Sequence, residues 1–411
     1  MTRPVDDTVS LPGNIIDLPS NGYKFRLYSS IFDVPESWDE VAPPNEFLRR
    51  KYLGVLEQNP PRGMRFTYVI FYDKDQPIGI SYFQISHFRP DRSIKDVDTK
   101  DKYPCIIRAF ARHLKVFVAK KFDHNLLVCG NLLLTGEHGF HFAEGKLNRE
   151  EQFRLLEECI RKVHAIWEEQ GLYIDGIFIK DIEPQHLPQT RVLVDKKYRK
   201  FTFHPNMVLN IRDDWESFDD YLAALSSKYR VRARRAFKAA KDVVRKDLDL
   251  GYIRNNNQRL YQLYLSVMDN ASFNMVVLDE QYLPALKEAF GDQFKITGYF
   301  LDGELIGYCS TLLNDGELEA HFLGFEEACN RKCQLYLNIL YDILRQGIEA
   351  GAKKVVYART AMEIKSSVGA VPVDMLCYIK AAHPVTNKVL PHLLEYLRPP
   401  DDWVQRKPFK R

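Results

Sequence analysis

"FTYVIFYDKDQPIGISYFQ" at residues 66–84 and "FKITGYFLDGELIGYCSTL" at residues 294–312 follow one pattern. When the two stretches are aligned without a gap, Ile78 falls on Ile306, and the glycine after each falls on the other. Each stretch has two β-branched and aromatic runs around a polar turn, which predicts a two-stranded hairpin. The ungapped match indicates that one structural unit occurs twice in the chain.

A third strand and a long amphipathic helix follow each hairpin. The helices read "REEQFRLLEECIRKVHAIWEEQG" and "RKCQLYLNILYDILRQGIEAG", and they end at Gly171 and Gly351, where a left-handed glycine stop is expected. A short apolar strand and a polar segment follow each glycine. The order predicts an α/β protein of the α+β kind, with two tandem domains that each have a mixed, mostly antiparallel sheet flanked by helices.

The positions of the two copies in the sequence predict the domain boundaries. Residue numbers in the two copies differ by 228 at the hairpins and by 180 at the helix ends, so the first copy carries an insertion near residues 87–123. We expect an N-terminal domain at 1–212 and a C-terminal domain at 213–411. A basic junction helix at 214–246 is expected to begin the second domain.

Composition limits the class of protein. The chain has 411 residues, 45% of them apolar and 27% charged, as in a packed globular protein of two domains. No run approaches the roughly 20 apolar residues of a membrane span, and the first residues do not follow the plan of a signal peptide, so we expect a cytoplasmic protein. Seven scattered cysteines indicate reduced thiols, and no metal site is expected because zinc spacing is missing.

The whole order of elements resembles the GNAT acyltransferase fold, and two copies joined by a basic helix resemble the FemABX-like double-GNAT proteins. The resemblance covers nearly the whole chain from about Lys24. Its most specific segments are "YLAALSSKYRVRARRAFK" at 221–238, "AHFLGF" at 320–325 and "YARTAMEIKSSVGA" at 357–370.

The junction segment combines an apolar stripe with an excess of cations. Residues 228–246 hold nine Lys or Arg against one Asp. Charge runs are usually solvated faces, yet so many unpaired cations repel one another unless an anion lies near. In FemABX-like proteins similar cations meet the phosphates of the substrate. The resemblance implies this substrate-binding role for Lys228, Arg230, Arg232 and Arg235.

The fourth strand of the second copy holds His321. A lone histidine there is more often a core residue, whereas the resemblance implies a strand beside the acyl-donor slot, with His321 as a general base of suitable ordinary pKa. Typical GNAT domains follow this strand with a glycine-rich loop that binds coenzyme A pyrophosphate. Here no glycine lies between Gly324 and the helix that follows, which disfavours binding of coenzyme A. The donor-binding candidates are Leu323, Gly324, Asn330 and Arg331.

A polar cluster follows the fifth strand, where ligands gather in open α/β sheets. Thr360 and Glu363 have the spacing of a capping box, and they are also candidates for substrate binding. Arg359 and Lys365 remain as cations for an anion, and Lys365 is the second catalytic candidate. We expect Lys228 or Arg230 to share one cleft with Arg359 or Lys365.

Two functions from different classes stay open. The first is an N-acyltransferase that moves an acyl or aminoacyl group from an activated donor to an amine of an anionic or carrier-linked acceptor. The second is a non-catalytic GNAT-fold protein that binds an anionic ligand. No tightly bound cofactor is expected. Acyl-CoA or aminoacyl-tRNA would be the co-substrate, and tRNA ranks lower because aromatic residues are not interleaved with the cations.

Overall fold

The structure is a computed structural model of the chain, described here for residues 15–18, 22–88, 124–202, 204–269, 276–397 and 403–410. The chain forms two compact units. Unit 1 contains the described residues up to Thr202 together with Val276 and residues 376–397. Unit 2 contains residues 204–269, 277–375 and 403–410.

Unit 1 is built on one mixed sheet in the order β1-β2-β3-β4-β5-β7-β16-β8, with β6 paired to β4. Its strands are β1 (Ile15–Asp17), β2 (Tyr23–Tyr28), β3 (Arg65–Asp73), β4 (Gln76–Phe88), β5 (His124–Cys129), β6 (Phe140–Phe142), β7 (Gly176–Ile182), β8 (Arg199–Thr202) and β16 (Leu376–Ala381). Its α-helices are α1 (Ser37–Val41), α2 (Arg50–Gln58), α5 (Arg149–Glu169), α6 (Arg191–Asp195) and α15 (Pro384–Leu397).

Unit 2 has a seven-stranded sheet in the order β10-β11-β12-β13-β14-β9-β15. Its strands are β9 (Asn206–Asn210), β10 (Val244–Asp247), β11 (Phe294–Leu301), β12 (Glu304–Asn314), β13 (Glu317–Phe325), β14 (Lys354–Val356) and β15 (Val371–Val373). Its α-helices are α7 (Phe218–Ala224), α8 (Ser227–Ala239), α9 (Leu250–Asn255), α10 (Asn257–Met268), α11 (Tyr282–Phe290), α12 (Glu327–Cys333), α13 (Leu335–Glu349) and α14 (Met362–Ser367).

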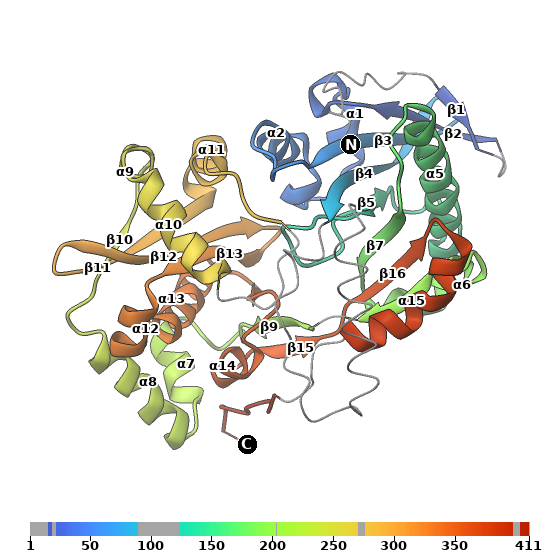
Figure 1. The fold of residues 1–411 in the computed structure, drawn as a ribbon. Coiled ribbons are helices and arrows are strands. Elements are labelled where there is room, and N and C mark those ends of the chain that lie inside the picture. Colours follow the sequence, from blue (N-terminus) through green and yellow to red (C-terminus); the bar gives the residue numbers. More distant parts are fainter. Residues whose placement is uncertain are drawn as a thin grey trace, which may run out of the picture. The chain divides into compact units, whose positions relative to one another are not determined.

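The two sheets have the same strand order, so the predicted duplication is confirmed. From β2 onward, each position in the sheet of unit 1 has a counterpart in unit 2, as the two sheets of Figure 1 show. The strand directions also agree, because β5–β7 and β13–β14 are parallel and the other neighbouring pairs are antiparallel. Both domains therefore have the predicted mixed, mostly antiparallel sheet.

Each sheet contains a strand supplied by the other half of the sequence. β9 follows β8 in the chain but lies between β14 and β15, and β16 follows β15 but lies between β7 and β8. The expected boundary at 212/213 therefore differs from the observed units: β9 belongs to unit 2, whereas β16 and α15 belong to unit 1. The expected insertion near 87–123 falls almost entirely on residues 89–123, which lie outside the described residues.

The hairpins that predicted the duplication match in detail. β3 and β4 shift register between Phe71 and Tyr72, and β11 and β12 shift between Tyr299 and Phe300, so that each has a bulge at the isoleucine of its Ile-Gly pair. A Cβ atom on Gly79 would lie at or within 3.0 Å of three ring atoms of Phe142. The glycine after the bulge thus lets β6 pack directly on β4.

The long helices begin and end as their sequences predict. Asn148 and Glu151 form a capping box at the start of α5. Gly171 and Gly351, beyond α5 and α13, have φ angles of 81° and 63°, so the predicted left-handed stops are confirmed. In the described part of the chain, no helix combines the length and the apolar character that crossing a membrane requires.

Each unit has its own hydrophobic core. In unit 1 the apolar face of α5 shares a core with β2, β3, β4, β5 and β7. In unit 2 the helices α7, α8 and α13 share a core with β13 and β14, and α10 and α11 cover the opposite face through Tyr264 and Tyr282 (Figure 1). The middle strand of the sheet, β13, and the helix α13 therefore lie at the centre of unit 2.

Gly79→Ala tests the close approach in the first hairpin. The added methyl group would press on Phe142, which is buried, and overpacking of this kind costs about 1–3 kcal/mol. We expect this loss in urea unfolding followed by circular dichroism. Gly251→Ala, on the exposed helix α9, is the control and should leave stability unchanged or slightly higher. Equal stabilities of the two variants would contradict the packing of β6 on β4.

Candidate functional site

The candidate site begins where two parallel strands of unit 2 separate. β13 and β14 pair over three residues, from Glu317 with Lys354 to Glu319 with Val356. β13 then continues to Phe325, whereas the chain after Val356 turns through residues 357–361 into α14. The pair therefore opens at the carboxyl ends of its strands, which is where ligands of open α/β sheets bind.

A bulge in β13 lies just beyond this opening. Ala320 faces Thr311 and Leu323 faces Cys309, so two β13 residues, His321 and Phe322, stand opposite Ser310 alone. The Ser310 Oγ accepts a hydrogen bond from the Phe322 N–H (3.0 Å) and donates one to the Phe322 carbonyl (2.9 Å). The Ser310 side chain thus satisfies the backbone groups that the bulge displaces.

His321 is enclosed by aromatic rings. Its Nε2 is 3.0 Å from the Tyr282 hydroxyl, and its ring centroid is 4.6 Å from that of Phe322. Burial lowers the pKa of His321 to about 3, so its imidazole is neutral and weakly basic at pH 7. The ordinary pKa expected for a general base is therefore not the one that this environment gives.

Glu319 is a titratable residue that sequence reasoning missed. It is the last β13 residue paired with β14 and lies two positions before His321. Burial, together with the neighbouring Glu317 carboxylate, raises the pKa of Glu319 to about 8. The sequence did offer a signal for Glu319, because an acidic residue stands two positions before His321 inside an apolar strand. Its proton equilibrium near neutral pH is what acid–base catalysis requires.

Lys365 holds the loop that follows β14. Its Nζ donates to the carbonyls of Tyr357 (2.6 Å), Ala358 (3.2 Å) and Arg359 (2.6 Å). Ala358, Thr360 and Ala361 have φ angles of 56°, 67° and 47°, which are strained for residues other than glycine. Burial lowers the pKa of Lys365 to about 7. Lys365 is thus, in this structure, a residue that positions the loop.

The capping box expected at Thr360 and Glu363 does not form. α14 begins at Met362 after Ala361, which has a left-handed conformation and makes no side-chain cap. The Glu363 carboxylate instead accepts hydrogen bonds from Arg406 Nε (3.1 Å) and Nη2. Arg359 donates through Nε to the His204 carbonyl at 2.9 Å. The strained loop, rather than a cap, leads the chain into α14.

The basic junction is two helices rather than the single helix expected at 214–246. α7 ends before Leu225, which is extended, and α8 begins at Ser227. Arg230 folds back and donates to the carbonyls of Leu222, Ala223 and Leu225 at the end of α7. The interruption is therefore stabilised by one of the cations that were expected to bind substrate.

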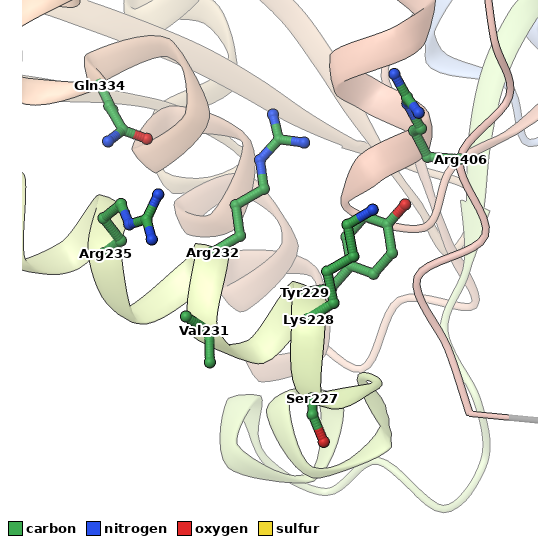
Figure 2. Close-up of a pocket in the computed structure, with 8 residues that line it drawn as sticks. All are labelled: Ser227, Lys228, Tyr229, Val231, Arg232, Arg235, Gln334 and Arg406. Atoms are coloured by element: carbon green, nitrogen blue, oxygen red, sulfur yellow. The ribbon is translucent and has the colours of Figure 1, made fainter.

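The remaining junction cations line a pocket, which we call the anion pocket. Its volume is about 700 Å³, and its eight lining residues are Ser227, Lys228, Tyr229, Val231, Arg232, Arg235, Gln334 and Arg406. Lys228, Arg232 and Arg235 lie on one face of α8, and in Figure 2 they follow one another along the helix, with Arg406 at the Lys228 end. Four of the eight residues are cations and none is acidic, so the pocket is suited to an anion.

The expected shared cleft differs from this arrangement. Lys228 lines the anion pocket, as do Arg232 and Arg235. Arg230, Arg359 and Lys365 are bound to backbone carbonyls and are not among the lining residues. Outside α8, the pocket is lined by Gln334 and Arg406, which the sequence did not suggest because both reach the pocket through tertiary contacts.

The four expected donor-binding residues all have other contacts. Leu323 packs against the core of unit 2, and a Cβ atom on Gly324 would lie within 2.7 Å of the α10 backbone. The Asn330 Oδ1 accepts the Tyr336 N–H at 2.9 Å near the start of α13, and Arg331 pairs with Glu327 at 3.1 Å on the surface. Donor binding by these residues stays a prediction.

The corresponding place in unit 1 is filled by the chain itself. Between β5 and β6, residues 130–139 form a loop that is tied to the end of β7. Lys180 Nζ donates to the Leu134 carbonyl at 2.6 Å, and the Gly136 N–H donates to Asp181 at 3.1 Å. Residues 130–139, which include Gly130, Gly136 and Gly139, are therefore a packed loop.

One group in unit 1 has metal-ligating atoms close together. The ligand atoms of Glu137, Glu183 and His186 all lie within 4.8 Å of one another. Arg149 forms an ion pair with Glu137, and its charge acts with burial to lower the pKa of His186. Since the group already holds the Arg149 cation, we assign no metal to it.

Arg230→Ala separates structural from ligand-binding cations on α8. Loss of three charge-assisted hydrogen bonds at the end of α7 should lower the free energy of unfolding by about 1–2 kcal/mol. Arg234→Ala removes an exposed cation of the same helix and should leave stability unchanged or higher, because it relieves like-charge repulsion. Urea unfolding of both variants is the measurement. Equal effects would show that Arg230 is not a cap.

Buried histidine predicts a loss of stability in acid. An exposed histidine has a pKa of about 6.5, and burial lowers that of His321 to about 3, so the unfolded chain binds more protons between these values. Stability should therefore fall as pH drops below about 6.5. Between pH 7 and pH 4, the free energy of unfolding should fall by roughly 1–3 kcal/mol less in His321→Gln than in the natural protein.

His392→Gln serves as the control for this measurement, because His392 is exposed on α15. The pH dependence of its unfolding should match that of the natural protein. If His321→Gln behaves in the same way as the control, the imidazole is not held neutral by its surroundings.

No family model and no curated protein matches the sequence. Among solved structures, the chain is similar to one titled FemX, with 10% identity and a TM-score of 0.49 over 83% of this chain and 97% of that one. It is similar to a tandem GNAT protein from the clavulanic acid biosynthesis pathway, with 11% identity and a TM-score of 0.49 over 88% and 99%. A third is L-PGS from Bacillus licheniformis, with 14% identity and a TM-score of 0.42 over 84% and 96%.

These likenesses concern the fold alone, and no activity, substrate or donor is carried over from them. As a likeness of fold, this is the resemblance that the sequence predicted.

Proposed function

We propose that the chain is an N-acyltransferase of the GNAT/FemABX-like type. It transfers an acyl or aminoacyl group from an activated donor to an amine of an anionic or carrier-linked acceptor. The observation that carries the proposal is the anion pocket of unit 2, the unit that also contains the parallel strand pair β13–β14. The pocket binds the acceptor's charge and so brings its amine into the unit where the donor is attacked.

The transfer needs one new bond and one proton acceptor. The acceptor nitrogen attacks the activated carbonyl carbon, the bond to the donor's leaving group breaks, and the amine proton passes to a base. Glu319 is the candidate base, since its carboxyl titrates near pH 8 at the point where β13 and β14 separate. Besides burial, the groups that act on the Glu319 carboxyl are Glu317, Lys354 and Asn314.

We expect the protein to bind coenzyme A weakly. Backbone N–H groups of a glycine-rich loop usually bind its pyrophosphate, and residues 325–334 contain no glycine. Aminoacyl-tRNA is the other donor, and its phosphates would suit the exposed cations of α8. Either donor presents an activated acyl carbonyl, as a thioester in acyl-CoA and as an ester in aminoacyl-tRNA.

A second function has its own support. The Lys365 amine is engaged by three carbonyls and the His321 imidazole is a weak base, so neither expected catalytic group stands free for proton transfer. A non-catalytic protein that binds an anionic ligand in the same pocket would need none of these groups.

Steady-state transfer separates these functions. The protein is incubated with acetyl-CoA or aminoacyl-tRNA and an amino sugar phosphate, and acylated product is measured by mass spectrometry. Arg232→Ala should raise the KM for the acceptor at least tenfold with little change in kcat, since a charge-assisted contact contributes about 1.5–3 kcal/mol. Glu319→Gln should instead lower kcat. Arg234→Ala, off the pocket, is the control.

Calorimetry completes the test. Binding of the amino sugar phosphate without turnover by either donor would favour the non-catalytic alternative. Binding of free coenzyme A with a low-micromolar Kd, about −8 kcal/mol, would contradict the donor argument. Arg232→Ala with an unchanged KM would remove the anion pocket from the mechanism.

A further inference from the structure

The last described residues, 403–410, form a segment of unit 2 that we call the C-terminal strap. It is bound to the α7–α8 junction through backbone hydrogen bonds, from the Ser226 N–H to the Pro408 carbonyl (2.8 Å) and from the Lys410 N–H to the Ala224 carbonyl (3.1 Å). Leu225 and Phe409 form a single β-bridge between these two bonds. The strap is therefore bound to the place where the two basic helices meet.

Phe409 anchors the strap in an aromatic seat. Its ring centroid lies 5.5 Å from that of Trp215 and 6.1 Å from that of Tyr221, and the Arg212 guanidinium lies 4.8 Å from it. A Cβ atom on Gly369 would lie 2.5 Å from the ring, and Gly369 has a φ of 112°. A glycine at that position makes room for Phe409, so the seat is shaped to receive this residue.

Arg406 extends from the anchored strap to the anion pocket. The Arg406 N–H donates to Ser366 Oγ at 3.0 Å, and the guanidinium donates through Nε and Nη2 to the Glu363 carboxylate. These bonds use two of the five guanidinium N–H donors, so Nη1 has its two hydrogens left for a ligand. Figure 2 shows Arg406 across the pocket from Arg232 and Lys228.

This placement has an electrostatic consequence. Arg406 brings a fourth positive charge to a pocket whose other cations are Lys228, Arg232 and Arg235, and like charges at this spacing repel. Glu363 offsets part of this repulsion, but it is 49% exposed and contributes little. A bound oxyanion would remove the remaining repulsion by accepting hydrogen bonds from cations on both sides of the pocket.

We propose that the C-terminal strap is a ligand-coupled wall of the anion pocket. The strap delivers Arg406 to the bound oxyanion, and the oxyanion in turn holds the strap in its seat. Glu363 is a positioning residue that orients the guanidinium. The inference rests on the anion pocket of the proposed function, but not on any acyl transfer.

The coupling must act in both directions, because linkage between two binding events is reciprocal. If ligand binding tightens the strap, then loosening the strap must weaken ligand binding by the same factor. A strap that is merely structural would show neither effect. This difference gives two measurements that do not depend on knowing the natural substrate.

The first measurement is calorimetry with inorganic pyrophosphate as the probe. Arg406→Ala should weaken its binding at least tenfold. Phe409→Ala leaves every lining side chain in place, yet it should weaken binding at least threefold because Arg406 is no longer held. Lys407→Ala removes an exposed cation of the strap outside the lining and should change binding less than twofold.

The second measurement is hydrogen exchange of residues 403–410 with and without pyrophosphate. Pyrophosphate should slow exchange of this segment several-fold in the natural protein and have no such effect in Arg406→Ala, whose Phe409 anchor is intact. The Arg406→Ala variant keeps the test valid if Phe409→Ala fails to fold.

Three results would overturn the inference: no pyrophosphate binding, equal binding by the natural protein and Arg406→Ala, or exchange that is insensitive to pyrophosphate. Failure of the proposed function looks different, since the strap would respond to pyrophosphate while no acyl product forms. Conversely, acyl transfer with an insensitive strap would leave the proposed function standing and remove the coupling.

Discussion

Insertion of one strand between two others is the constraint on which this structure depends. β9 pairs with β14 on one side and β15 on the other, and β16 pairs with β7 and β8 in the same manner. Without its inserted strand, each sheet would have two unpaired strand edges in its interior. Buried backbone groups without partners are costly, so each unit requires residues from the other half of the sequence.

The position of β9 also determines where the candidate site forms. Met207 in β9 receives the Tyr357 N–H and donates its own to the Ala358 carbonyl, which fixes the first residues after β14. Lys365 then binds three carbonyls of the same stretch from the other side. The strained loop is thus held by a strand and an ammonium group together, which explains how three left-handed residues persist within four positions.

The cations of the junction illustrate how one sequence feature divides into different roles. Arg230 closes the end of α7, whereas Arg232 and Arg235, two and five residues later, face the anion pocket. Helical periodicity places these residues on different faces. A run of basic residues therefore does not act as a unit, and the break at Leu225 decides which residue becomes a cap.

Local patterns predicted the repeated elements well. The hairpins with their aligned Ile78 and Ile306, and the stops at Gly171 and Gly351, follow from residues that are neighbours in sequence. The strand exchange could not be predicted in this way. β8 and β9 belong to different sheets, but nothing in their residue patterns shows which strands they pair with. Arg406 and the low pKa of His321 were missed for the same reason, since both result from contacts distant in sequence. The capping-box spacing at Thr360 failed because the positive φ of Ala361 starts the helix differently.

The exchange of β16 has a consequence for synthesis on the ribosome. β7 and β8 emerge long before β16, which begins at Leu376, so the gap between them stays open while the chain from β9 to β15 is synthesised. Open strand edges on a growing chain are liable to pair with other chains. The sheet of unit 1 starts first and yet receives its last strand after all strands of unit 2 have been made, so a chaperone that shields strand edges would act during this interval.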